Sequence, residues 1–319
     1  MRLIKESYKS RTLILVNHLG GQKRQDFEEI RVKIDALASE IDVQIVDARQ
    51  SAETLDSNVW HRPCLVVSFG PLNAFWPKRG SIYCCRFIPK FQQVAKLHGA
   101  NVPVPLSAQL VVGRPLDRRV WGPLVVLKPT TPGFMSHGAV FLMRTEKVGE
   151  LAQTIFPLGH PSRRLPVLIQ RFIDTGELPS YYRVLTLFGE PLYCRKGYAT
   201  KPRPPLDASD DVLLKARIAT NAEFAKHHFS NDADVLDLAR RAYAALPSIP
   251  LQGVDIIREA ATGNLFVLEI NAGGNTWHFS SRYIESIPNA STREERIAQF
   301  GAWDVAARIL IKKTREQAR

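Results

Sequence analysis

Two carboxylates and one amide are spaced so that they could hold a metal ion. Asp255 lies in one apolar run, Glu269 and Asn271 lie in the next, and the turn-forming residues 262–264 stand between the runs. If this turn closes a β-hairpin, Asp255 lies across from the Glu269 to Asn271 end of the second strand. Glu269 and Asn271 are two residues apart, so both side chains point to the same face of that strand.

This group of oxygen atoms indicates magnesium bound together with a nucleotide. Two carboxylates among apolar neighbours are costly unless a cation binds them. Mg²⁺ prefers hard oxygen ligands and commonly bridges to phosphate groups, so Mg²⁺ with ATP is the expected ligand. The alternative interpretation is that Asp255 and Glu269 are exposed hairpin residues paired with arginines.

The order of these residues resembles the ATP-grasp superfamily, in which an Asp on one strand and Glu-x-Asn on the next hold magnesium. Two lysines extend the resemblance. Lys90 precedes a short helical pattern and a turn at residues 99–103, and Lys128 stands in Val-Val-Leu-Lys-Pro. The resemblance implies that Lys90 and Lys128 hold the α- and β-phosphate region of ATP. It covers roughly residues 88–290.

The resemblance also implies a glycine-bearing loop over the phosphates and a hinge against the adenine. The loop contains Ser136, His137 and Gly138, and its backbone N–H groups could cradle the β- and γ-phosphates. The hinge hydrogen-bonds the adenine through its backbone, a carboxylate about seven residues later holds the ribose, and apolar side chains wall the base. These residues are Gln170, Arg171, Phe172 and Ile173 in the hinge, Glu177 at the ribose and, with Phe172 and Ile173, Leu268 at the base.

The reaction that the resemblance implies is activation of a carboxylate. The γ-phosphate of ATP would pass to the acid and form an acylphosphate, which an amine would then attack. Arg195, together with Arg183, is expected to stabilise the developing charge, although the acidic residue that often comes before this hairpin arginine in the family is absent here. The substrate pocket is expected at Asn275, His278, Arg282 and the N-terminal domain.

Two other functions stay open at this stage. One is an ATP-grasp kinase, which phosphorylates a hydroxyl group and stops. The other is a non-catalytic nucleotide- or nucleic-acid-binding protein, favoured by the net charge of +12 from 43 basic and 31 acidic residues. Because the basic residues are scattered and no aromatic-plus-basic motif accompanies them, we expect small-molecule carboxylate and amine substrates rather than nucleic acid. A homodimer is compatible with the family.

The elements that must position these residues can be predicted from the apolar pattern. A strand–helix–strand pattern at the start of the chain predicts a small α/β unit with a parallel sheet. It consists of apolar runs at 12–17, 43–46, 63–69 and 82–87 and a helical pattern at 26–40. The expected fold is an α/β (α+β) ATP-grasp fold with three units. These are an N-terminal pre-grasp domain over 1–88, a small (lid) subdomain over 89–170 and a large subdomain with the metal site over 171–319.

Further runs predict the elements of the two later units. Strands are expected at 124–127, 139–143 and 167–172, a β-hairpin at 183–187 and 192–195, and a second hairpin at 254–258 and 265–270. Helices are expected at 91–97, 233–246 and 292–314, and the His227-His228 pair is interpreted as part of a solvated helix.

Several classes of protein are disfavoured by what the sequence lacks. It contains no GxxxxGK[ST] phosphate loop and no GxGxxG motif. Its four cysteines form no CxxC pair, so reduced thiols and a cytoplasmic location are expected. No run approaches the ~20 apolar residues of a membrane span.

Overall fold

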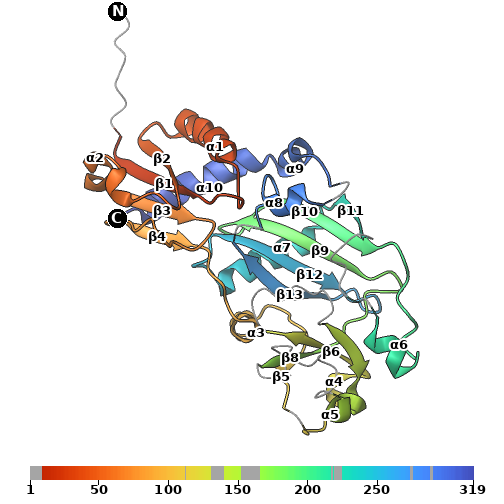
Figure 1. Ribbon diagram of the computed structural model, residues 1–319. Coiled ribbons are helices and arrows are strands. Elements are labelled where there is room, and N and C mark those ends of the chain that lie inside the picture. Colours follow the sequence, from red (N-terminus) through yellow and green to blue (C-terminus); the bar gives the residue numbers. More distant parts are fainter. Residues whose placement is uncertain are drawn as a thin grey trace, which may run out of the picture.

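The computed structural model describes residues 9–111, 113–130, 140–151, 166–216, 218, 225–273, 276–287 and 290–319. These residues form three β-sheets, and the five-stranded sheet lies between the other two (Figure 1). The mixed α/β class that the sequence predicts is therefore confirmed.

The first sheet is parallel, with the strand order β2-β1-β3-β4, as the N-terminal pattern predicts. Its two inner strands are apolar runs that are buried on both faces, which is typical of a parallel sheet covered on both sides. The elements are β1 (Arg11–Asn17), α1 (Arg24–Leu37), β2 (Ile41–Asp47), η1 (Ala52–Thr54), α2 (Ser57–His61), β3 (Cys64–Ser68) and β4 (Ser81–Cys84).

The second sheet is antiparallel and small, with the order β5-β8-β6-β7. Its strands alternate so that one face packs around Val125, Leu127 and Ile169. The elements of this region are α3 (Lys90–Gly99), β5 (Ser107–Gln109), α4 (Arg118–Trp121), β6 (Leu124–Pro129), β7 (Phe141–Arg144), η2 (Thr145–Lys147), α5 (Val148–Leu151) and β8 (Val167–Arg171).

The central sheet is also antiparallel, with the order β11-β10-β9-β12-β13, and it contains both predicted hairpins. One of its faces packs against helix α7 around Val184, Val254 and Ile270. The elements are β9 (Ser180–Leu187), β10 (Glu190–Ala199), α6 (Asp210–Leu214), β11 (Ala225–Phe229), α7 (Ala233–Ala245), β12 (Leu251–Arg258) and β13 (Leu265–Ala272).

The interpretation of His227 and His228 as helical is wrong, because both lie in edge strand β11. Their backbones pair with β10, His227 opposite Gly197 and His228 opposite Lys196. This pairing satisfies the backbone of a polar segment whose side-chain pattern alone gives little sign of a strand.

The last helix of the chain returns to the first sheet, whereas the helix before it packs against β10 of the central sheet. The single helix predicted over 292–314 is divided at Gly301, whose φ of +63° is the left-handed conformation that glycine adopts readily. Helix α10 packs beside α1 and against β1 and β3 (Figure 1). The elements are α8 (Arg282–Glu285), α9 (Arg293–Phe300) and α10 (Ala302–Gln317). The division of the chain at 88 and 170 stays a prediction.

The four cysteines are free, as the sequence predicts. Burial raises the pKa of Cys64, Cys85 and Cys194 to about 12, so these thiols are unreactive packing groups. Within the described ranges, no helix is both long enough and apolar enough to cross a membrane.

Candidate functional site

A row of charged side chains crosses the central sheet. The strand register places Arg195 opposite Arg183, Arg183 opposite Asp255, and Asp255 opposite Glu269. Directly opposite residues share a face of a sheet, so two cationic and two anionic side chains lie side by side on the face away from α7. The hairpin geometry predicted for Asp255 and Glu269 is therefore confirmed.

Asn271 lies next to this row. It stands two residues beyond Glu269 on β13 and faces Gly253, and its side-chain amide donates a hydrogen bond of 2.9 Å to Asp255 Oδ2. The amide oxygen of Asn271 and the carboxylates of Asp255 and Glu269 thus belong to one cluster.

A β-bulge in β13 lies at the residues predicted to hold a metal. Asp255 pairs with Glu269, whereas Ile256 pairs with Val267, so Leu268 is an extra residue between the two pairs. A bulge re-aims the side chains around it. Leu268, the predicted wall of the adenine site, is half-exposed immediately beside Glu269.

Asp255 forms a two-pronged ion pair with Arg183. The guanidinium donates from Nη2 to Asp255 Oδ2 at 2.8 Å and from Nε to Oδ1, and each side chain is only 13% exposed. The arginine therefore neutralises a carboxylate that would otherwise be buried alone, which is costly. The partner of Arg183 therefore comes from β12, on the neighbouring strand of the central sheet.

Glu269 is paired with Lys90, the first residue of α3. Burial works against the charged carboxylate, but the ammonium of Lys90 and, at a greater distance, that of Lys128 outweigh it and lower the pKa of Glu269 to about 2. One predicted phosphate lysine and one predicted metal ligand are therefore in direct contact.

Lys128 of β6 extends from the small sheet towards the same cluster. Its ammonium donates to Gln170 Oε1 at 2.8 Å, and Gln170 in turn donates to Ser107 Oγ at 3.0 Å. Burial and the nearby Lys90 lower the pKa of Lys128 to about 8, although the carboxylates of Glu269 and Asp255 act in the opposite direction. The role predicted for Gln170 involves its backbone only, whereas its side chain accepts from Lys128. A polar side chain within the apolar run 167–170 is the sequence feature that indicates this role.

The predicted adenine hinge keeps few free backbone donors. The N–H of Arg171 bonds to Leu106 and that of Phe172 bonds to Leu124, at 2.8 and 3.1 Å. Within the described residues, the backbone N–H of Ile173 has no hydrogen-bond partner. It is therefore the hinge donor that is available to hydrogen-bond an adenine ring. Glu177, the predicted ribose ligand, is exposed. Ser136, His137, Gly138 and Asn275 lie outside the described residues.

A second, cationic group of side chains lies at the other end of the charged row. Arg195 and His278 are buried, and Arg195 Nε and both ring nitrogens of His278 have no hydrogen-bond partner in the described part of the chain. Burial and then the nearby guanidiniums, that of Arg195 first, hold the pKa of His278 well below its usual range. Buried donors without partners suit an anionic group.

The residues present fit a magnesium–nucleotide site. Their donors are carboxylate and amide oxygens, the ligand types that Mg²⁺ takes, and two lysine ammonium groups lie within electrostatic reach. No group of three or more His, Cys, Asp or Glu side chains suited to a metal occurs in the described ranges. The predicted metal ligands, Asp255, Glu269 and Asn271, do not form such a group, because Asn271 contributes an amide rather than a carboxylate.

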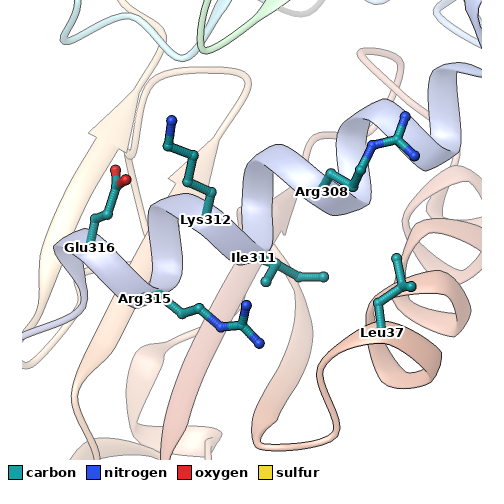
Figure 2. Close-up of a pocket in the computed structure, with 6 residues that line it drawn as sticks. All are labelled: Leu37, Arg308, Ile311, Lys312, Arg315 and Glu316. Carbon is teal, nitrogen blue, oxygen red and sulfur yellow. The ribbon is translucent and has the colours of Figure 1, made fainter.

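A shallow pocket lies elsewhere, between α1 and α10 (Figure 2). It has a volume of about 380 Å³ and contains none of the predicted site residues. Arg315, which lines it, is already paired with Glu40. Its lining residues are Leu37, Arg308, Ile311, Lys312, Arg315 and Glu316.

Comparison with solved structures identifies the fold as that of ATP-grasp ligases. The ATP-grasp ligase PsnB, complexed with a minimal precursor, Mg and ADP, superposes with a TM-score of 0.53 and 15% identity. The match covers 98% of this chain and 100% of PsnB. The macrocyclase MdnC from Microcystis aeruginosa MRC, bound with the precursor peptide MdnA, gives a TM-score of 0.51 and 10% identity, over 94% of this chain and 99% of MdnC. No protein-family model and no curated protein sequence matches the chain. The ATP-grasp resemblance is confirmed at the level of the fold.

Proposed function

We propose that this chain is an ATP- and magnesium-dependent ligase that activates a carboxylate as an acylphosphate and joins it to an amine. The observation that carries the proposal is the convergence of Lys90 and Lys128 on Glu269 and Asp255. These four residues come from four elements, α3, β6, β12 and β13, and lie together in a fold that ATP-grasp ligases share.

In this proposal the Glu269 end of the charged row binds the magnesium nucleotide, and the Arg195 end binds the group that is phosphorylated. Lys90 and Lys128 bind the α- and β-phosphates, and the hinge from Gln170 to Ile173, with Glu177 and Leu268, holds the nucleoside. Mg²⁺, held by Asp255, Glu269 and Asn271, would neutralise phosphate charge when bound. The task of the protein is mainly to position the reactants and to balance charge.

Arg195 and Arg183 act where the acid is activated. Arg195 is buried and its Nε is without a partner in the described residues, so it can donate to oxygens of the transferring phosphoryl group. Removal of one such donor typically costs about 10²–10³ in rate. A free carboxylate is a poor acyl donor, and phosphorylation supplies the leaving group that it lacks.

The proposal is tested by screening acids for ATP consumption. The full chain is incubated with ATP, MgCl₂ and hydroxylamine, and each acid of a panel is added in turn. The panel contains the protein amino acids, simple dicarboxylic acids and Asp- or Glu-containing peptides. Peptides are included because PsnB and MdnC have been solved in complex with precursor peptides. We expect acid-dependent ADP release accompanied by a hydroxamate. ADP release with a phosphorylated alcohol, and no hydroxamate, would instead favour a kinase.

The metal role is tested with one acidic substitution and a matched control. Glu269→Ala should abolish acid-dependent ADP release, because it removes a predicted magnesium ligand. Glu190→Ala removes an exposed carboxylate at the start of β10 and should leave the rate unchanged. Unchanged turnover in Glu269→Ala would refute the assigned metal role.

A further inference from the structure

The first sheet has a switch point between β1 and β3. With the order β2-β1-β3-β4, the chain leaves β1 towards β2 on one side and returns to β3 on the other. In open parallel sheets, ligands bind beyond the carboxyl ends of the strands at such a point. His18 follows the last residue of β1, and Ser68 is the last residue of β3, where it pairs with Val16.

His18 and Ser68 form a hydrogen-bonded pair with a defined tautomer. Ser68 Oγ donates its one proton to the carbonyl of Gly70 at 2.7 Å, and the same oxygen lies 2.7 Å from His18 Nε2. Because the hydroxyl proton is already used, Ser68 must accept from Nε2–H. The lone pair of the imidazole therefore stands on Nδ1, for which the described residues provide no partner.

The ring of His18 lies with its face against Gly70. A Cβ added at Gly70 would lie 2.8 Å from Nδ1, 2.8 Å from Cε1 and 3.0 Å from Nε2, nearly equal distances that place it over the ring plane. Gly70 therefore supports the ring without blocking the in-plane lone pair of Nδ1. Burial lowers the pKa of His18, which keeps the imidazole neutral at neutral pH.

The segment after β13 connects the ends of β1 and β3 to the charged row. Trp277 stacks on Phe69, with ring centroids 4.9 Å apart. The N–H of Arg282 bonds to the carbonyl of Gly20 at 3.1 Å, and its side chain lies over Gly20. The strand that carries Glu269 and Asn271 is thus tied to the loops after β1 and β3.

We propose that the amine substrate binds beyond the carboxyl ends of β1 and β3 and that His18 Nδ1 accepts its proton. This inference rests on the proposed ligase function. The amino-acid nitrogen enters as an ammonium and passes one proton to Nδ1, and the resulting imidazolium keeps its Nε2–H bond to Ser68. The free amine then attacks the carbonyl carbon of the acylphosphate, the C–N bond forms, and the C–O bond to phosphate breaks. Inorganic phosphate leaves with the electron pair and takes the second N–H proton.

The test compares two nucleophiles in a variant that keeps the Ser68 hydrogen bond. In His18→Gln, the side-chain amide can still donate to Ser68 Oγ, but no base remains at the position of Nδ1. Amino acids are mainly protonated at neutral pH and need a base, whereas hydroxylamine is largely unprotonated and does not. The assay uses full-length chain, ATP, MgCl₂ and the acid panel, with either the mixed protein amino acids or hydroxylamine as the nucleophile.

We expect His18→Gln to lower amide formation about 10²-fold while hydroxamate formation stays within about threefold of the unsubstituted chain. Ser68→Ala, which removes the group that fixes the tautomer, should lower amide formation by a smaller factor in the same selective way. Amide formation at the original rate, or an equal loss of both products, would overturn the inference. An unsubstituted chain that makes no hydroxamate with any acid would remove the proposed function, and this inference with it.

Discussion

Lys90, at the start of α3, forms an ion pair with Glu269, which lies 179 residues further along the chain on β13. In the proposed site Lys90 binds a negatively charged phosphate group, and Glu269 binds a positively charged magnesium ion. Each must leave its present partner for a magnesium nucleotide to be held. The pair therefore couples binding of the metal to binding of the nucleotide.

This coupling predicts that one substitution changes ATP affinity in opposite directions. In Glu269→Gln, Lys90 has no carboxylate partner, so ATP measured in EDTA should bind several-fold more tightly. In the presence of MgCl₂ the same variant should bind more weakly, because a metal ligand has been lost. Isothermal titration calorimetry under the two conditions measures both effects. Weaker binding in both would show that Glu269 does not restrain Lys90.

The Arg183–Asp255 pair predicts a large effect on stability. Arg183→Met leaves Asp255 buried without its cation, which should lower the free energy of unfolding by about 3–5 kcal/mol. Arg24→Met, which removes an i,i+4 pair with Glu28 on the surface of α1, should change it by less than about 1 kcal/mol. Urea denaturation of both variants gives the comparison, and equal small effects would contradict the burial argument.

Lys128 predicts how nucleotide affinity depends on pH. Its pKa of about 8 means that the ammonium, the form that attracts phosphate, is present below pH 8 and is lost above it. ATP is fully ionised in that range, so affinity should fall above pH 8, by up to about tenfold per pH unit. In Lys128→Arg the cation persists, and the fall should disappear. The same pH profile in both chains would exclude Lys128 as the cause.

The sequence pattern of the β12–β13 hairpin predicted the relative positions of Asp255, Glu269 and Asn271. The alternation along β13 placed Glu269 and Asn271 on one face, and the turn at 262–264 placed Asp255 across from Glu269. Both results follow from strand geometry, which the order of residues determines over short distances. The first sheet was predictable for the same reason, because its inner strands β1 and β3 are short and mostly apolar.

Partners that come from distant segments were not predictable in the same way. Nothing near Lys90 in the sequence indicates Glu269, because the pair depends on the packing of α3 against β13. Nothing near Arg183 indicates Asp255, because that pair depends on the pairing of β9 with β12. The edge strand containing His227 was missed since its pairing with β10, rather than its own pattern, fixes its conformation. His18 and Ser68 are fifty residues apart and meet only because β1 and β3 are parallel neighbours.

The most direct test of the central claim is a structure of this chain with magnesium and a non-hydrolysable ATP analogue. The account predicts Mg²⁺ at about 2.0–2.1 Å from an oxygen of Glu269, with Asp255 and Asn271 completing its protein ligands. It also predicts phosphate oxygens within hydrogen-bonding distance of Lys90 and Lys128. A nucleotide bound elsewhere, with the Lys90–Glu269 pair unchanged, would contradict the account.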